Sequence, residues 1–335
     1  MENEIDLKKG DWEAAIDNSL TLVRKSDDLQ QFLTEIIGNG YFPKQLPPPF
    51  QTVSFSSAFK NHQEDYIKIL KKVLWRKNSM ESAQLYKYSY ARPRQLRRIF
   101  SIPNPAHFIL LSLELAASWQ ELYDLSNSSS FSMSKPTRHV KDSLTDEEIP
   151  IDDLNLGLET ASTLAKETEN NVDEKRSRSL EFSNTWDKLS EKKLACRSTA
   201  KYIAKADIAR FFPTIYTHMI PWILHGKETS KNKKNDYSLL GNRLDTLIRN
   251  AQDGQTLGLP IGPDSSFLIS ECILSKIDNE LQQRLKGCDY KIIRIVDDYE
   301  FACFNRSTAE KCISVLQEIL LEYELELNTY KSEIL

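Results

Sequence analysis

The chain has 335 residues, a formal net charge of −4 and 40% hydrophobic residues, enough for a core in one large domain or two ordinary ones. The charge excludes a basic, nucleic-acid-binding composition overall, and five cysteines without a CxxC pair disfavour a disulfide framework or a zinc site. The N-terminus lacks the apolar stretch of a signal peptide, and the longest apolar run, residues 107–119, is too short to span a bilayer, so we expect a cytoplasmic protein that contacts no membrane.

The first third of the chain predicts helices joined by an extended connector. Apolar residues recur at helical spacing over residues 11–40, and residues 63–77 and 106–125 share this pattern. Three consecutive prolines stiffen residues 45–59 into an extended connector. Residues 94–102 predict a short strand that a proline-rich turn ends.

Basic residues gather in the same region. Residues 71–101 contain nine Lys or Arg and a single acid, with Tyr86, Tyr88 and Tyr90 between them. Such tyrosines can stack on single-stranded nucleic acid. An exposed strand face explains them equally well, so both interpretations stay open.

Residues 126–185 differ in composition from what precedes them. A serine-rich stretch is followed by a polar one, in which twelve acidic and four basic residues lie between Asp142 and Glu181. Chains of this composition bury too little apolar surface to fold alone. We therefore interpret residues 126–185 as a polar, acidic, mobile insertion with one short helix at residues 157–167.

Regular structure is expected again from residue 186. The expected helices span residues 186–196, 212–226, 236–251, 264–285 and 307–322, and the expected strands residues 201–208, 289–296, 299–305 and 323–328. A lysine-rich loop separates the second and third of these helices. With only ten glycines the chain favours helices, and this order of elements predicts a helix-rich α+β fold with an antiparallel sheet.

Two adjacent aspartates interrupt an apolar pair of strands. Asp297 and Asp298 lie where the strands 289–296 and 299–305 meet, which makes them the tip of a hairpin. Burying unpaired carboxylates is costly, so either the tip is solvated or a cation neutralises it. Asp207 ends another apolar strand, where it could also be a simple cap. If these strands are neighbours, the three carboxylates share one edge of the sheet.

Carboxylates grouped in this way are the hard oxygen ligands that Mg²⁺ prefers, together with water and substrate phosphates. Two such ions, about 3.5–4 Å apart, stabilise the attacking and leaving oxygens in phosphoryl transfer. The pattern is therefore consistent with a site for two Mg²⁺ ions at Asp207 and Asp297, with Asp298 beside them.

Five sequence motifs resemble those of reverse transcriptases. In chain order they are RRIFSIPNP at 97–105 (a fingers motif), ADIARFFPTIYTH at 206–218 (motif A), GLPIGPDSSF at 258–267 (motif B), IVDDY at 295–299 (motif C) and LNTYKSEI at 327–334 (motif D). Within that superfamily, four segments are similar in sequence to the bacterial abortive-infection (Abi-type) and related phage-defence reverse transcriptases. They are FFPTIYTHMIPWILHGK, LPIGP, VDDYEF and YFPKQLPPPF.

The resemblance implies a right-hand polymerase architecture of palm and fingers, and an RNA-directed DNA polymerase type of nucleotidyltransferase. Residues 1–125 would form an N-terminal extension and the fingers, residues 126–185 the insertion, and residues 186–335 the palm with motifs A to D. We expect the thumb and the C-terminal helical domain to be absent from this chain, because it stops just after motif D. It would then be either a fragment or a short natural form.

The resemblance also assigns catalytic roles. Asp207 and Asp297 would bind both metals, Asp298 would support them, and the carbonyl of Ile208 would face a metal. Lys331 would protonate the pyrophosphate leaving group or hold it as a point charge. An ordinary surface lysine is the alternative for Lys331.

Further positions would contact the dNTP. Phe212 falls where these enzymes block the sugar 2′-OH, although a core phenylalanine is the alternative. Arg97 and Arg98 would hold triphosphate oxygens with their donor forks, unless they belong to a plain solvated strand. Pro260 and Gly262 would shape the floor beneath the incoming base.

Two residues depart from the usual motifs. Ile295 stands where an aromatic residue is usual in motif C, and Ile261 where glutamine is usual in motif B. Both changes remove contacts that help templated polymerases handle the primer and the base pair. Proteins similar to this one can also prime synthesis on their own hydroxyl side chain, for which Tyr41 is the candidate, with simple packing as the default.

Three functions stay open. The first is Mg²⁺-dependent synthesis of single-stranded DNA from dNTPs in antiphage defence, without a template, with protein priming as an option and RNA as a further partner. The second is conventional template copying of the group II intron or retron type. The third is a catalytically idle palm that binds nucleic acid as a scaffold. A homo-oligomer is compatible with the closer family.

Overall fold

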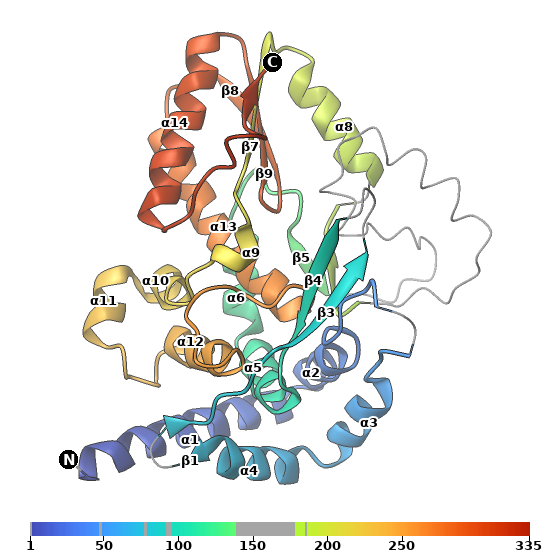
Figure 1. The fold of residues 1–335 in the computed structure, drawn as a ribbon, viewed down its shortest axis with the longest axis vertical. Helices are drawn as coiled ribbons and strands as arrows, with labels where there is room; N and C mark the ends of the chain where they lie inside the picture. The colour runs from blue at the N-terminus through green and yellow to red at the C-terminus, as the bar shows by residue number, and fades with distance from the viewer. Residues whose placement is uncertain (1, 47–48, 77–78, 92–95, 139–177, 185) are drawn as a thin grey trace.

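The computed structural model describes residues 2–46, 49–76, 79–91, 96–138, 178–184 and 186–335. The short helix expected at residues 157–167 and most of the acidic part of the insertion lie outside these residues. The described chain forms a body of helices at one end and a sheet with helices packed on it at the other (Figure 1).

Four antiparallel strands form the main sheet. They are β7 (Tyr202–Asp207), β8 (Tyr290–Ile295), β9 (Asp298–Cys303) and β10 (Glu333–Ile334), in the spatial order β10-β7-β9-β8. The pairing of β7 with β9 and the β8–β9 hairpin agree with the sequence-based expectation. The strand expected at 323–328 is wrong. Within that segment only Leu327 forms a bridge, to Ile208, and β10 is the edge strand instead.

Helices cover both faces of this sheet because alternate residues of a strand point to opposite sides. Phe301 and Cys303 of β9 join the large hydrophobic core, together with Cys312 of the helix after it. Ala302, between them, packs with Leu189 in a separate cluster on the other face. The covering helices are α8 (Trp186–Arg197), α13 (Asp264–Arg284) and α14 (Arg306–Glu322).

The body of helices surrounds α5. Its helices are α1 (Glu2–Arg24), α2 (Asp27–Asn39), α3 (Val53–Asn61), α4 (Gln63–Leu74), α5 (Pro105–Ala117), α6 (Trp119–Ser126), α9 (Phe211–Thr214), α10 (Met219–His225), α11 (Lys227–Asn232) and α12 (Leu240–Asn250). The Asn104 side chain caps the start of α5 by accepting from the Ala106 amide (2.9 Å). Residues 107–116 are all buried, as expected for a helix surrounded by others.

Four helical segments differ in detail from expectation. The helix expected at 212–226 is divided into α9 and α10. The helix expected at 106–125 is interrupted at Ser118, which separates α5 from α6. The proline-rich connector ends earlier than expected, since α3 begins at Val53. The lysine-rich loop contains α11, which is anchored by a hydrogen bond from Ser230 Oγ to the Pro221 carbonyl (2.8 Å). That contact spans nine residues and leaves no trace in the local sequence pattern.

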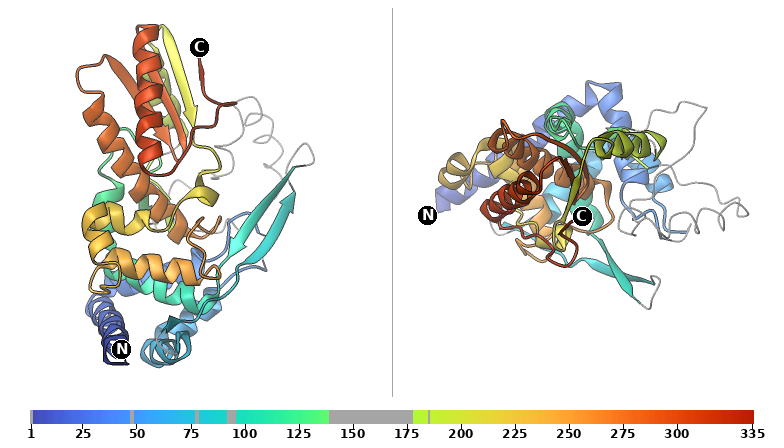
Figure 2. Two further views of the ribbon diagram at one scale, coloured as in Figure 1. Left: turned by 60° about the vertical axis from the view of Figure 1, so that its left-hand side comes forward. Right: turned by 90° about the horizontal axis from the view of Figure 1, so that it is seen from above.

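Three short antiparallel pairs complete the fold. They are β1 (Trp75–Arg76) with β2 (Ser79–Met80), β3 (Tyr86–Ala91) with β4 (Arg97–Ile102), and β5 (Pro136–Arg138) with β6 (Leu180–Phe182). The β3–β4 hairpin projects away from the body of helices (Figure 2). Tyr86 and Tyr90 are exposed on it, whereas Tyr88 contacts the ring of Phe50.

The serine-rich stretch at the start of the expected insertion lies inside the fold. Ser129, Ser132 and Ser134 are buried, and the residues on either side of 139–177 pair with each other as β5 and β6. The insertion that we expected at residues 126–185 therefore includes folded structure near both of its ends. The serines are tolerated because each hydroxyl has a partner: those of Ser132 and Ser134 donate to Glu271, and Ser129 Oγ accepts from two backbone amides.

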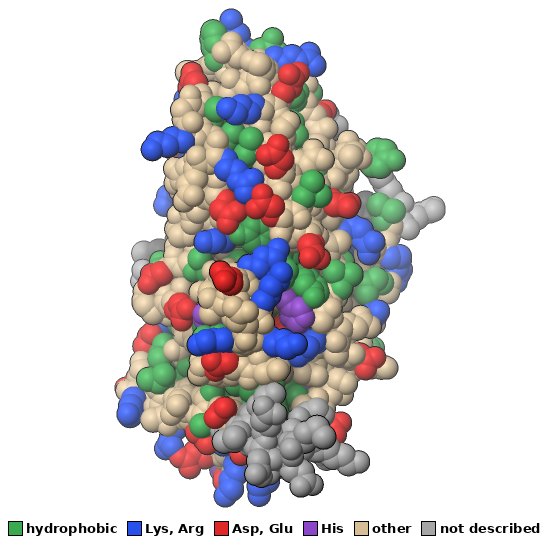
Figure 3. Space-filling model, turned by 90° about the vertical axis from the view of Figure 1, so that its left-hand side faces the viewer, with side chains coloured by type: hydrophobic (Ala, Val, Ile, Leu, Met, Phe, Trp, Pro, Cys, Tyr) green, Lys and Arg blue, Asp and Glu red, His purple; other side chains and the backbone are tan. Residues whose placement is uncertain are grey.

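The surface carries charges of both signs. On the face shown in Figure 3, Lys and Arg side chains alternate with Asp and Glu rather than gathering by sign. All five cysteines are free; four of them are buried, and Cys288 is half-buried. Among the helices that the structure describes, none combines the length and the apolar character needed to cross a membrane.

Candidate active site

Three carboxylates meet at one end of the main sheet. Asp207 is the last residue of β7 and Asp298 the first of β9, and the two are direct partners across these strands. Asp297 lies in the two-residue turn between β8 and β9. The expectation that these residues share one edge of the sheet is confirmed. Like charges placed opposite each other destabilise a sheet, so this arrangement carries a cost.

The turn that carries Asp297 has an unusual backbone. Val296 has a φ of 49°, in the left-handed region that β-branched residues rarely adopt. Such a conformation costs about 1–3 kcal/mol and persists only where the surroundings impose it. Here the Val296 amide donates to Ser134 Oγ (2.8 Å), and its carbonyl accepts from Arg294 Nη1 (3.0 Å).

The segment after α14 closes the other side of the site. Its Asn328 amide donates to the carbonyl of Asp207 (2.7 Å), and the Ala209 amide donates to the carbonyl of Glu326 (2.8 Å). The Ile208 amide donates to the carbonyl of Asp297 (3.2 Å). Backbone hydrogen bonds thus join three segments that are far apart in the sequence.

Two side chains from this segment bind Asp207 directly. Lys331 Nζ lies 2.8 Å from Oδ2 of Asp207, and Asn328 Nδ2 donates to Oδ1 (3.0 Å). Asp207 is only 4% exposed, so both of its oxygens have a protein partner in a nearly buried position. The structure therefore brings Lys331 to the carboxylates, where the sequence motif placed it.

The carboxylates affect one another's protonation. Burial raises the pKa of Asp297 to about 6, with a further contribution from the charge of Asp207, whereas the charges of Lys331 and Arg98 act in the opposite direction. Burial and the neighbouring Asp297 raise the pKa of Asp298 to about 8. Burial opposes the charge of Lys331, but its hydrogen bond to Asp207 and the three carboxylates outweigh this and raise its pKa. The positive charge of Lys331 therefore does not balance the carboxylates of the site.

The two neighbouring phenylalanines of motif A have different surroundings. Phe211 is buried in the core (2% exposed), whereas Phe212 is half-buried. The Phe212 carbonyl accepts a hydrogen bond from the Leu259 amide (2.8 Å), which joins motif A to motif B next to Pro260. Phe211 therefore belongs to the core, whereas Phe212 stays partly accessible.

The two arginines of the hairpin point to different partners. Arg97 is exposed and its guanidinium donates to the hydroxyl and the carbonyl of Ser89 on the neighbouring strand (2.8 and 2.9 Å). Arg98 is half-buried, stacks 5.8 Å from the ring centre of Phe100, and its charge acts on Asp297. Of the two, the structure therefore brings Arg98 toward the carboxylates.

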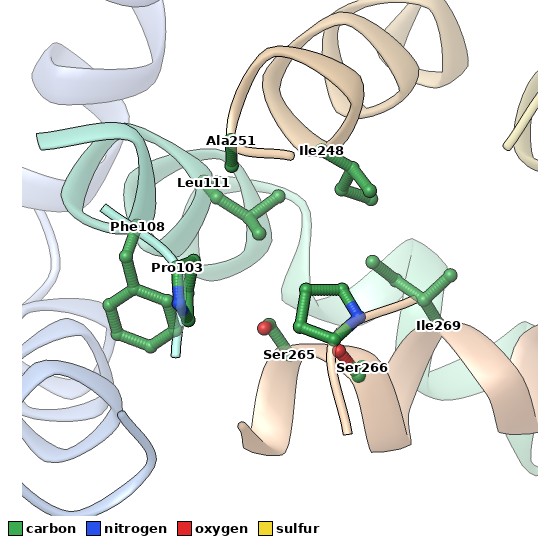
Figure 4. Close-up of a pocket in the computed structure, with 9 residues that line it drawn as sticks. Pro103, Phe108, Leu111, Ile248, Ala251, Ser265, Ser266 and Ile269 are labelled. Atoms are coloured by element: carbon green, nitrogen blue, oxygen red, sulfur yellow. The ribbon is translucent and has the colours of Figure 1, made fainter. Parts of the chain in front are cut away.

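Motif B forms a tight floor between the hairpin and the N-terminal segment. Gly262 has a φ of 130°, and a Cβ atom there would lie 2.2 Å from Cγ of Pro43, so only glycine fits. The Ile261 carbonyl accepts from the Ser101 amide of β4 (3.0 Å). Pro260 is one of the residues that line a cavity of ≈ 10 Å³. The walls of this cavity are mostly apolar and come largely from α5, α12 and α13 (Figure 4). Such a volume holds about one water molecule at most, so it is no ligand pocket.

Tyr41 has a structural partner. Its side chain is buried, and its hydroxyl donates to the carbonyl of Pro103 (2.6 Å). Burial raises the pKa of this hydroxyl far above its usual value. These observations fit the default of simple packing, and a priming role for Tyr41 stays a prediction without support from this conformation.

Comparison with known proteins identifies the family. Residues 157–335, just over half of the chain, match the family described as reverse transcriptase (RNA-dependent DNA polymerase). The chain belongs to this family. Among solved structures it is similar to apo telomerase from Candida tropicalis truncated from its C-terminal domain, with 13% sequence identity and a TM-score of 0.41. That match covers 84% of this chain and 55% of the other, so the chain spans little more than half the length of that structure. No curated protein matches the sequence.

As a member of the reverse transcriptase family, the chain has an α+β fold of the palm-and-fingers type. The main sheet, which lies within the matched residues, is the palm sheet of this fold, and the assignment of the β3–β4 hairpin to the fingers stays a prediction. The motifs A, C and D that the sequence indicated thus correspond to β7, to the β8–β9 turn and to the segment between α14 and β10.

The donor set of this reverse transcriptase suits divalent metal ions. Within the described ranges, no group of three or more His, Cys, Asp or Glu side chains has the spacing of a formed metal site. Instead, the Lys331 ammonium is the cation that contacts Asp207. Three carboxylates against one ammonium leave an excess of negative charge on hard oxygen ligands, which is what Mg²⁺ requires. Asp207, Asp297, Asp298 and the carbonyl of Ile208 stay the predicted ligands.

The raised pKa values predict how stability depends on pH without metal. In the folded chain the pKa values of Asp297 and Asp298 lie above the ordinary value of 3.8. Between about pH 4 and 8 the folded state therefore holds more protons than the unfolded state. Their stabilising contribution is complete below about pH 4 and is lost as the pH rises to 8. In EDTA, we expect the Tm of the wild type to fall between pH 5 and 8 by roughly 5 °C more than that of Asp298→Asn. Parallel Tm profiles would contradict this.

Two features of the site were missed by sequence reasoning. Asn328 lies within motif D, but only Lys331 of that motif was assigned a role in the site. Ser134 was assigned to the insertion, although Arg294, a charge within the apolar run 292–296, was a signal that a buried polar network surrounds the turn.

Proposed function

We propose that this reverse transcriptase is a cytoplasmic Mg²⁺-dependent DNA polymerase that adds dNTPs without a template and acts in antiphage defence. The observation that carries the polymerase part is the convergence of Asp207, Asp297 and Asp298 at one sheet end, with Lys331 bound to the first of them. An idle palm has no need to keep three carboxylates whose mutual repulsion is costly.

The residues have complementary roles in this proposal. When bound, two Mg²⁺ ions would activate a primer hydroxyl and neutralise the triphosphate. Asp207 and Asp297 would hold these ions, with Asp298 supporting them. Lys331 would leave Asp207 as the ions bind, and its ammonium would hold the pyrophosphate or give it a proton. Arg98 would bind triphosphate oxygens from the fingers side.

Two apolar residues support synthesis without a template. Ile295 is buried against the α8 side of the palm sheet, and Ile261 has its carbonyl engaged by the fingers strand β4. Neither side chain offers the aromatic face or the amide that the template-copying enzymes use there. The role in defence rests on the resemblance of the motifs to those of the Abi-type enzymes.

The test uses purified protein, Mg²⁺ and labelled dNTPs, with neither template nor primer, and compares the wild type with Asp297→Asn. We expect the wild type alone to form labelled products on a denaturing gel. Products that stay with the protein until protease treatment would indicate protein priming. Label that appears only with a primed RNA template would identify the conventional enzyme. No label in either condition would favour the scaffold.

The role in defence is tested separately in bacteria that express the protein. We expect expression of the wild type to lower the plating efficiency of a sensitive phage, and Asp297→Asn to restore it. Equal protection by both proteins would rule out a defence role that depends on polymerisation.

Phe212 is expected to select deoxynucleotides. Phe212→Ala should open space for a 2′-OH and reduce the preference for dNTPs over rNTPs by about 10- to 100-fold, measured as the ratio of kcat/KM values. Phe211→Leu is the matched control, because Phe211 is in the core and its truncation should lower Tm without altering this ratio. An unchanged ratio in Phe212→Ala would assign Phe212 to packing alone.

A further inference from the structure

A buried polar network lies beneath the turn of motif C. Its centre is Glu271 of α13, which is fully buried. Oε1 of Glu271 accepts from Ser134 Oγ (2.8 Å) and from Arg294 Nη1 (3.0 Å). Oε2 accepts from Ser132 Oγ (3.0 Å) and from Arg294 Nη2 (3.1 Å). One carboxylate therefore fixes two serines and one guanidinium.

Arg294 is fixed from a second side. Its Nε donates to Oδ2 of Asp278 (2.8 Å), and Oδ1 of Asp278 accepts from the hydroxyl of Tyr299 (2.8 Å). Arg294, Asp278 and Tyr299 are all buried. Because every partner in this network is buried, an alternative position for the guanidinium would leave charged groups without partners.

The serines belong to a segment that pairs with the palm sheet. Ser132 and Arg294 form a parallel bridge, the Met133 amide donates to the Arg294 carbonyl (2.8 Å), and the Arg294 amide donates to the Phe131 carbonyl (3.0 Å). The segment 131–134 thus lies beside β8 and pairs with it through an isolated bridge and two backbone hydrogen bonds. This pairing sets the position of Ser134 relative to the turn.

The network ends on the backbone amide and the backbone carbonyl of Val296. Ser134 Oγ accepts from the Val296 amide and Arg294 Nη1 donates to its carbonyl. Val296 is the residue whose left-handed backbone needs support from its surroundings, and Asp297 is the next residue. The conformation of Val296 determines the direction in which Asp297 leaves the turn, toward Asp207 and Asp298.

We infer that Ser134 is a positioning residue for the motif C aspartates, acting together with Glu271 and Arg294 by holding Val296 in its left-handed conformation. The inference rests on the proposed polymerase function of the site. It gives the serine-rich segment, which lies outside the five sequence motifs, a defined part in assembling the carboxylates for metal.

The test compares Ser134→Ala with Ser132→Ala. Both hydroxyls are buried and both donate to Glu271, but only that of Ser134 also contacts the turn. We expect both variants to lower the urea midpoint of unfolding. Ser134→Ala should weaken Mn²⁺ binding, measured by calorimetry, by about 10- to 100-fold, as found when a residue supporting a metal ligand is lost. Ser132→Ala should change it by less than about 3-fold, and Ser134→Thr should preserve it.

A second background separates positioning from general stability. Val296→Gly permits the left-handed conformation without strain, so Ser134→Ala should weaken Mn²⁺ binding far less in this background. An equal loss in both backgrounds, or unchanged Mn²⁺ binding in folded Ser134→Ala, would overturn the inference. If Ser134→Ala does not fold, hydrogen exchange of the unaltered protein decides. The Val296 amide should exchange as slowly as the amides of β9, and rapid exchange would overturn the inference.

These measurements need no substrate. Failure of the inference is read from Mn²⁺ binding and amide exchange, whereas failure of the proposed function is read from the absence of nucleotide incorporation by the unaltered protein. With an active wild type, kcat should fall in Ser134→Ala in parallel with Mn²⁺ affinity.

Discussion

Replacing Asp297 with asparagine is expected to reduce nucleotide incorporation by about 1,000-fold or more and to leave the fold intact. The carboxylate is one of two predicted ligands of both ions, and losing about 4 kcal/mol of charge stabilisation in the transition state corresponds to such a factor. Asparagine keeps the shape of the side chain. Because burial and Asp207 raise the pKa of Asp297, its charge destabilises the metal-free protein, so the variant should unfold at an equal or higher urea concentration in EDTA.

The matched control is Asp289→Asn. Asp289 is an exposed aspartate just before β8, on the same hairpin but at the opposite end of the strand from the turn. It should retain full incorporation and unaltered stability. Incorporation by Asp297→Asn within 10-fold of the wild type would show that Asp297 is no essential ligand.

Replacing Arg294 with methionine is expected to be the most destabilising single change considered for this protein. Arg294 is fully buried between Glu271 and Asp278, and these carboxylates outweigh the effect of burial and raise its pKa. Removing it would leave both carboxylates buried without their cation. The free energy of unfolding should therefore fall by about 3–5 kcal/mol, measured by urea titration at pH 7.

A surface arginine provides the comparison for this variant. Arg284 pairs with Glu322, and both side chains are substantially exposed, so Arg284→Met should cost less than about 1 kcal/mol. The prediction for Arg294 also has a dependence on pH. Lowering the pH to about 5 should reduce the cost, because burial raises the pKa of Glu271, which can then bind a proton once its cation is gone. A cost below 1 kcal/mol at pH 7 would show that the network contributes little to stability.

The sequence predicted those parts of the site whose signals are local. Asp207, Asp297 and Asp298 interrupt apolar strands, and a carboxylate in such a place needs a special reason. The order of strands and helices then placed the three on one sheet edge, because β7 and β9 are antiparallel neighbours. Lys331 followed from motif D, and its contact with Asp207 agrees with that placement.

The parts that sequence reasoning missed depend on contacts between distant segments. Serines at 129–134 have the composition of a linker, and only the approach of Glu271 and Arg294 makes them part of the core. The strand expected at 323–328 had suitable residues, but the Asp207 carbonyl is taken by the Asn328 amide and regular pairing starts only at Glu333. Arg97 and Arg98 look equivalent in sequence, and the alternation of a strand sends them to opposite faces.

The order of the strands in the palm sheet has a consequence for biosynthesis. β7 lies between β9 and β10, which are both made much later, since Asp298 follows its partner Asp207 by about 90 residues. At roughly 5–20 residues per second, the ribosome needs about 5–20 s to supply that partner. During this interval both edges of β7 lack their final neighbours, and its apolar residues are open to wrong pairing. A chaperone that binds extended apolar segments would act on the nascent chain in this interval, and the three carboxylates would meet only after the segment that contains Asp297 and Asp298 has been made.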